Sequence, residues 1–109
     1  MRRAAAALAA LLALAGPAAA QGSGAALLEL CNGRERAEAM SCGLYILGIV
    51  QGHQLAAPEG RALCLPEGAD GFRLRDTVLA ALRRNPDAGK EPAAPLVIGA
   101  LRAAFPCRP

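Results

Sequence analysis

The amino-acid sequence predicts an all-α fold, a small bundle of about four helices that is cross-linked by disulfides. Three observations support this prediction. Turn and breaker residues divide the chain into four helix-like segments without an internal repeat. Only one segment also suits a strand, and no second strand is present to pair with its backbone. Four cysteines follow an N-terminal segment typical of exported proteins, in which disulfides form readily.

The N-terminal segment has the three parts of a signal peptide. Arg2 and Arg3 give a positive start, and an apolar run of Ala and Leu extends from Ala4 to Ala15. The small residues Ala18 to Ala20 then offer a cleavage site. The apolar run is shorter than the roughly 20 residues that a helix needs to cross a bilayer. We therefore expect residues 1–20 to be a signal peptide that is removed on export.

The remaining residues, 21–109, fit one small helical domain with a limited hydrophobic core. The whole chain has 12 Lys and Arg against 9 Asp and Glu, and loss of two N-terminal arginines leaves 10 against 9. A net charge of +1 creates no field that would draw the domain to nucleic acid or to a membrane. The aromatic residues are few, so stacking platforms for bases are absent as well. We expect neither kind of partner.

The first two helices are expected around a turn at Asn32-Gly33. A short helix from Ala25 to Leu30 ends at this turn signal. The central segment, Arg36 to Leu55, has an apolar middle that suits either a buried strand or a buried helix. Its length without proline favours a helix, apolar on all sides, at the centre of the bundle. Gly48 and Gly52 share one face of this helix, where small residues would let a neighbouring helix approach closely.

Two amphipathic helices follow a connector from Ala56 to Gly71 that is rich in Pro and Gly. The first extends from Phe72 to Arg84, has apolar residues at every fourth position, and begins after the predicted N-cap Asp70. An Asn-Pro dipeptide ends it. The second extends from Pro92 to Phe105, with prolines in its first turn, and stops at Pro106.

Four cysteines allow three disulfide pairings. Cys31 and Cys42 lie on either side of the first turn, so a helical hairpin would bring them together. Cys64 and Cys107 follow the second and fourth helices, whose ends share one side of an up-and-down bundle. We favour these two pairs, which would stabilise the fold by about 3 and about 4 kcal/mol in the loop-entropy relation. The spacing typical of zinc and redox sites is absent, so we expect no metal and no cofactor.

No set of residues in the sequence fits a catalytic centre. His53 is the single histidine, and an even number of cysteines leaves none unpaired for a Cys–His pair. No serine lies in a G-x-S-x-G motif. Glu35 and Glu38 are interleaved with arginines, which is typical of a solvent-exposed, salt-bridged face. We therefore expect the protein to act by binding, without catalytic residues.

Three motifs, in their order along the chain, resemble a known family. Ten residues separate Cys31 from Cys42, and Tyr-Ile-x-Gly follows. C-L-P-E-G begins at Cys64, and P-A-A-P-L-V-x-x-A-L-x-x-A-F-P-C occupies Pro92 to Cys107. This order is similar to that of the Rap/Tai family, small periplasmic immunity proteins that neutralise amidase effectors of type VI secretion. Gln51 stands where that family usually has an acidic residue.

The resemblance implies an all-helical domain, often a homodimer, that binds and blocks a cognate peptidoglycan amidase effector in the periplasm. A second interpretation is a periplasmic structural or housekeeping module with the same fold and no toxin partner, because a fold does not define a function. A neighbouring gene for a small amidase effector would favour the first interpretation, and a solitary gene would favour the second.

A few residues dominate the energy of most protein interfaces, and we expect those that bind the partner to lie on exposed loops. The exposed connectors are therefore the candidates. The two connectors are His53 to Arg61 and Asn85 to Glu91. The candidate partner-binding residues on them are His53, Gln54, Glu59, Arg61, Asp87, Lys90 and Glu91.

Overall fold

The computed structural model describes residues 2–7 and 22–108. In the domain, the elements are α2 (Gly24–Cys31), α3 (Arg36–Ala56), α4 (Gly71–Arg84), the 3-10 helix η1 (Pro86–Lys90) and α5 (Ala93–Ala104). The predicted all-α bundle of about four helices is confirmed, and the predicted cleavage site at Ala18 to Ala20 lies outside the described residues. Among the described helices, none has the length and apolar character needed to cross a membrane.

Side-chain caps define where the helices begin. The hydroxyl of Ser23 accepts the backbone N–H of Ala26 at 3.1 Å and so caps α2. The carboxylate of Asp70 accepts the N–H of Arg73 at 2.9 Å and caps α4, which confirms the predicted N-cap. Both caps satisfy backbone donors that would otherwise have no partner at the helix start.

Glu38 caps the start of α3, whereas the sequence predicted that it forms a salt bridge. Its carboxylate accepts the N–H of Glu35 at 3.2 Å, one turn earlier, and so caps α3. Within residues 2–7 and 22–108, the ion pair within 4 Å joins Arg75 to Asp76. Glu35 and Glu38 are exposed to solvent as predicted. The predicted salt bridges between them and the neighbouring arginines are wrong, because Glu38 turns to the backbone of its own helix.

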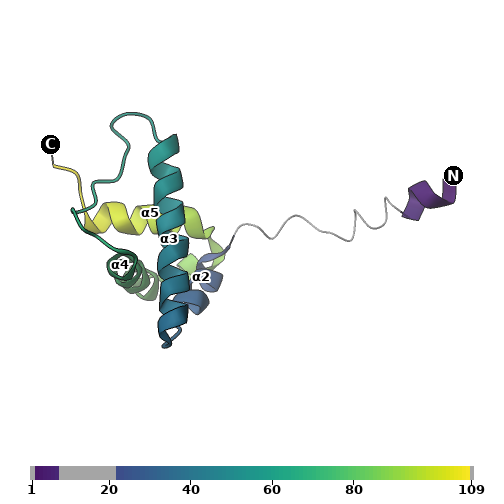
Figure 1. The fold of residues 1–109 in the computed structure, drawn as a ribbon, viewed down its shortest axis with the longest axis horizontal. Helices are drawn as coiled ribbons and strands as arrows, with labels where there is room; N and C mark the ends of the chain where they lie inside the picture. Colours follow the sequence, from purple (N-terminus) through teal and green to yellow (C-terminus); the bar gives the residue numbers. More distant parts are fainter. Residues whose placement is uncertain (1, 8–21, 109) are drawn as a thin grey trace.

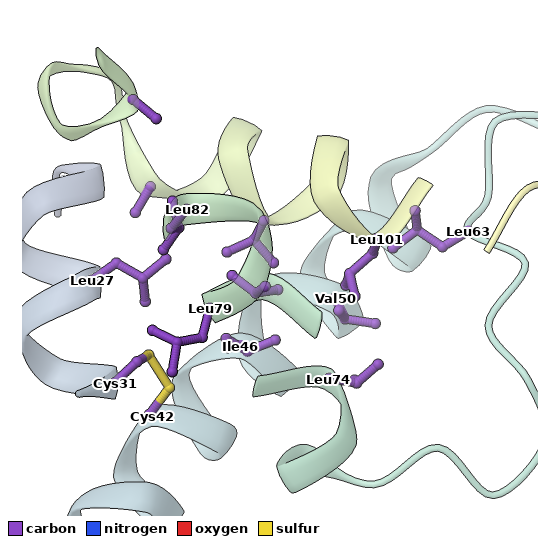
Figure 2. Packing of buried hydrophobic residues seen from close by; sticks show 14 residues of the cluster. Leu27, Cys31, Cys42, Ile46, Val50, Leu63, Leu74, Leu79, Leu82 and Leu101 are labelled. Carbon is purple, nitrogen blue, oxygen red and sulfur yellow. A yellow bond between two sulfur atoms is a disulfide. The ribbon is translucent and has the colours of Figure 1, made fainter. Parts of the chain in front are cut away.

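Helix α3 is the centre of the fold, and α2, α4 and α5 all pack against it (Figure 1). Its buried face carries Cys42, Ile46 and Val50, which meet the apolar sides of the other helices in one core (Figure 2). The opposite face is open, since Leu44 is 63% exposed and Met40 is 47% exposed. The expectation that α3 is buried on all sides is wrong, because its neighbours leave this face uncovered.

The close approach between helices is at a different glycine from the two expected. A Cβ on Gly48 or Gly52 would meet no atom within 4 Å. A Cβ on Gly43 would lie 3.1 Å from the carbonyl of Gly71, at the start of α4. The tight crossing of α3 and α4 therefore uses Gly43, and the predicted role of Gly48 and Gly52 in a helix contact is wrong.

The disulfides join Cys31 to Cys42 and Cys64 to Cys107, in the favoured pairing. The first is buried between α2 and α3 (Figure 2). The helices cross at steep angles in Figure 1 and do not alternate up and down, so Cys64 and Cys107 do not meet at a shared end of an up-and-down bundle as expected. Cys64 reaches Cys107 because the connector after α3 folds back toward the end of α5.

Arg75 of α4 fixes the turn between α2 and α3. Its Nη2 donates to the carbonyl of Cys31 at 2.7 Å and to that of Gly33 at 3.4 Å. A cation at the C-terminus of a helix is favourable because the last carbonyls are unpaired and carry partial negative charge. This contact joins the short helix α2 to α4, in addition to the disulfide that joins α2 to α3.

Candidate partner-binding site

Gln54, at the end of α3, holds the connector in place. Its side-chain oxygen accepts the N–H of Leu63 at 2.8 Å, and its nitrogen donates to the carbonyl of Leu63 at 3.2 Å. The Leu63 side chain is only 6% exposed and enters the core (Figure 2). Both polar atoms of the Gln54 side chain are therefore hydrogen-bonded to the backbone of Leu63.

His53 and Arg61 lie together, and a third residue, Arg102 of α5, joins them. The Nε2 atom of His53 lies 3.3 Å from the carbonyl oxygen of Arg61. Nη2 of Arg102 donates to the same carbonyl at 3.0 Å and lies 3.4 Å from Nε2 of His53. The guanidinium therefore connects the end of α3, the connector and α5 in one polar cluster, which we call the cationic cluster.

Glu59 lies at the tip of the connector. The N–H of Arg61 donates to the carbonyl of Pro58 at 3.0 Å and closes a tight turn around Glu59 and Gly60. Gly60 has a φ of +82°, a conformation that favours glycine and supports the turn. The side chain of Glu59 is exposed to solvent at this tip.

The second predicted connector is more ordered than a loop. Residues Pro86–Lys90 form η1, whose Ala88 is buried against the rest of the domain. The N–H of Gly24, at the start of α2, donates to the carbonyl of Glu91 at 2.8 Å. Packing against α2 therefore stabilises this segment, while the candidate side chains Asp87, Lys90 and Glu91 remain exposed.

The seven candidates form two groups and not one. The cationic cluster adjoins the C-terminal end of α5, and η1 immediately precedes its N-terminal end. The 12 residues of α5 span about 18 Å at 1.5 Å per residue. The structure thus brings His53 and Arg61 together but keeps them apart from Asp87 and Lys90.

Arg102 and the groove beside it were missed by the sequence analysis. An open groove of about 580 Å³ lies between α3 and α5 and is lined by Gly52, His53, Ile98 and Arg102, among others. A single arginine on the polar side of an amphipathic helix gives no local signal of this arrangement. Only the crossing of α3 and α5 places it next to His53.

An apolar patch occupies another part of the surface. Met40, Leu44 and Leu47 of α3 meet Phe72 of α4 around a hollow of about 220 Å³. Leu44 and Phe72 are 63% and 43% exposed. Contiguous exposed apolar side chains on a small domain often mark a protein interface.

The described side chains offer disulfide-bonded cysteines, charged connectors and an apolar patch. All four cysteines are in disulfides. In the described part of the chain, no cluster of three or more His, Cys, Asp and Glu side chains could hold a metal ion. The polar groups that come together at His53 contact backbone carbonyls of the connector, and the exposed surface offers charged connectors and an apolar patch.

The fold and these surfaces define a small helical binding domain cross-linked by disulfides. Residues 23–107 match the Rap1a immunity proteins, a span that includes α2 to α5 and both disulfides. The chain therefore belongs to the Rap1a immunity protein family, and its role is one of immunity through the binding of an effector protein. Searches of curated proteins and of solved structures found no match.

Proposed function

We propose that this chain is a periplasmic immunity protein that binds and blocks a peptidoglycan amidase delivered by type VI secretion. The observation that carries the proposal is the match of the whole helical domain, residues 23–107, to immunity proteins. The motif order around the four cysteines supports the amidase as the class of effector.

Two features support a periplasmic location. The chain begins with two arginines, an apolar run and small residues, which is the order of a cleaved export signal. The domain also contains two disulfides, which persist in oxidising compartments. Cleavage after Ala20 would give a protein that begins at Gln21. The intact mass of the protein recovered from periplasm tests this, and recovery of the full-length chain from cytoplasm would contradict it.

The mechanism is blockage of the amidase without turnover. His53, the single histidine, contacts the connector carbonyl and Arg102, and every cysteine is bonded to another. These groups hold the fold and the connector, and the exposed side chains around them can contact a partner. Inhibition is then expected to follow the molar ratio of the two proteins.

The test uses the mature domain and an amidase encoded beside its gene. Release of soluble fragments from isolated peptidoglycan is measured while the ratio of domain to amidase is increased. Activity falls in proportion and stops near an equimolar ratio. Inactivation of excess amidase by a trace amount of the domain would show that the protein acts as a catalyst. Absence of binding would favour a structural or housekeeping role in the periplasm.

The apolar patch of Met40, Leu44, Leu47 and Phe72 supports a homodimer. Homodimer interfaces are more apolar than the rest of a protein surface, and a two-fold axis pairs one patch with itself. Sedimentation of the mature domain tests this proposal. Leu44→Asp is expected to give monomers, whereas Leu55→Asp, an exposed position of the same helix outside the patch, is expected to leave the dimer intact. A wild-type monomer would refute it.

A further inference from the structure

The groove between α3 and α5 has an apolar floor and a positively charged end. Glycine, alanine, proline and isoleucine residues line most of it, and His53 and Arg102 line one end. Among the residues that the structure describes, no acidic one lines it. A segment that fits this groove therefore needs small or apolar side chains along its length and a negative charge at one end.

The fold does not explain the glycines of this floor. Gly48 and Gly52 of α3 and Gly99 of α5 all line the groove, and a Cβ on any of them would meet no atom within 4 Å. Each lies inside a helix, where glycine is less stable than alanine. Gly43 and Gly71 differ, because a Cβ at either position would crowd the backbone of the other helix.

Arg102 has hydrogen-bonding capacity left for a ligand. Both of its hydrogen-bond contacts, to the carbonyl of Arg61 and to His53, use the single nitrogen Nη2. An arginine side chain has five N–H donors, and two of them can bind one carboxylate in parallel. The ion pair in residues 2–7 and 22–108 joins Arg75 to Asp76, so no described carboxylate neutralises Arg102 or Arg61.

We propose that this groove binds an acidic segment of the effector, with small side chains on the glycine floor and an Asp or Glu carboxylate on Arg102. The proposal rests on the effector-binding function proposed above and names the chemistry of the segment recognised. It also moves the main contact from the tips of the connectors to the groove beside them. Charge complementarity decides the occupant, because Arg102, which lines the end of the groove, is positively charged.

The first experiment measures the affinity of the amidase for four variants of the mature domain. Arg102→Gln and Arg102→Lys both lose the planar fork, but only the first loses the charge. We expect about tenfold weaker binding for Arg102→Gln than for Arg102→Lys, as for loss of one charge-assisted hydrogen bond. Gly52→Leu fills the groove and is expected to weaken binding about 30-fold or more, the scale of a hot spot. Glu29→Gln, at an exposed position of α2 outside the groove, the apolar patch and both connectors, is the control and leaves the affinity unchanged.

Circular dichroism of each variant shows whether the fold is retained. Equal affinity of Gly52→Leu and wild type would overturn the proposal while the effector-binding function stands. Equal affinity of the Gln and Lys variants at position 102 would also overturn it, because the charge would then have no role.

A second experiment works without the amidase. A capped hexapeptide of Ala and Gly with one Asp at its end is added to the ¹⁵N-labelled mature domain, and amide chemical shifts are followed. The expected result is a shift of the Gly48, Gly52 and Gly99 signals that the matched Asn peptide does not produce. No shift, a shift elsewhere, or equal shifts with both peptides would overturn the groove proposal. Failure of the amidase to bind, with a positive peptide result, would instead refute the proposed function alone.

Discussion

Replacement of Gly48 and Gly52 by alanine is expected to stabilise the free domain. Both residues lie inside α3, and a Cβ at either position would point into open space. Alanine restricts the unfolded chain more than glycine does and is the better helix former. The substitution therefore gains helix stability without a steric cost.

The gain is about 1 kcal/mol for each position, the difference between glycine and alanine inside a helix. For a domain of this size, 1 kcal/mol corresponds to a rise of about 4–8 °C in Tm. Reversible thermal unfolding of the oxidised mature domain, followed by far-UV circular dichroism, measures this rise for each single variant. The same variants are expected to bind the amidase more weakly, because the added methyl groups enter the groove.

The matched control is Gly43→Ala on the same helix. A Cβ there would lie 3.1 Å from the carbonyl carbon and oxygen of Gly71, so α4 would have to move and the Tm is expected to fall. A lower Tm for Gly48→Ala or Gly52→Ala would refute the reasoning. It would mean that the helix needs these glycines for its own packing and not for a partner.

Three further outcomes test the fold. Arg75→Ala is expected to lower the free energy of unfolding by about 2 kcal/mol in urea titrations, because the last carbonyls of α2 lose a charged donor. Arg84→Ala, at an exposed position of the same helix, should cost less. Asp70→Ala removes the cap of α4 and should cost about 1 kcal/mol in the same titration. Mild reductant should open the exposed disulfide Cys64–Cys107 before the buried one, as alkylation and peptide mapping would show, and simultaneous opening of both would contradict this order.

The helices could be predicted to within one or two residues at each end. The central helix was expected from Arg36 to Leu55 and extends to Ala56, and the last one loses only its two terminal residues relative to Pro92 to Phe105. Caps, prolines and turn dipeptides act locally, so the sequence shows them directly. The 3-10 helix η1 could not be predicted, because contacts with α2 stabilise it.

The surface was less predictable than the helices. The exposure of Glu59 and Asp87 follows from their place in polar connectors, and both are exposed in the structure. The hydrogen bonds between the Gln54 side chain and the Leu63 backbone form only because the connector folds back onto the end of α3. No local sequence pattern specifies this path. The position of Arg102 beside His53 depends on the angle at which α5 crosses α3, a result of core packing.

The hydrogen bonds and the disulfide that hold the connector in place have a consequence for binding. The side chain of Gln54 is hydrogen-bonded to the backbone of Leu63, and Arg102 donates to the carbonyl of Arg61. The exposed disulfide joins Cys64 to Cys107, which follows α5. An unrestrained segment would lose conformational entropy when a partner binds, at a cost of about 1 kcal/mol or more per residue fixed. A connector already held in one conformation avoids much of that cost, so more of the contact energy is available as affinity. The exposed disulfide is therefore expected to contribute to the affinity for the effector as well as to the stability of the domain.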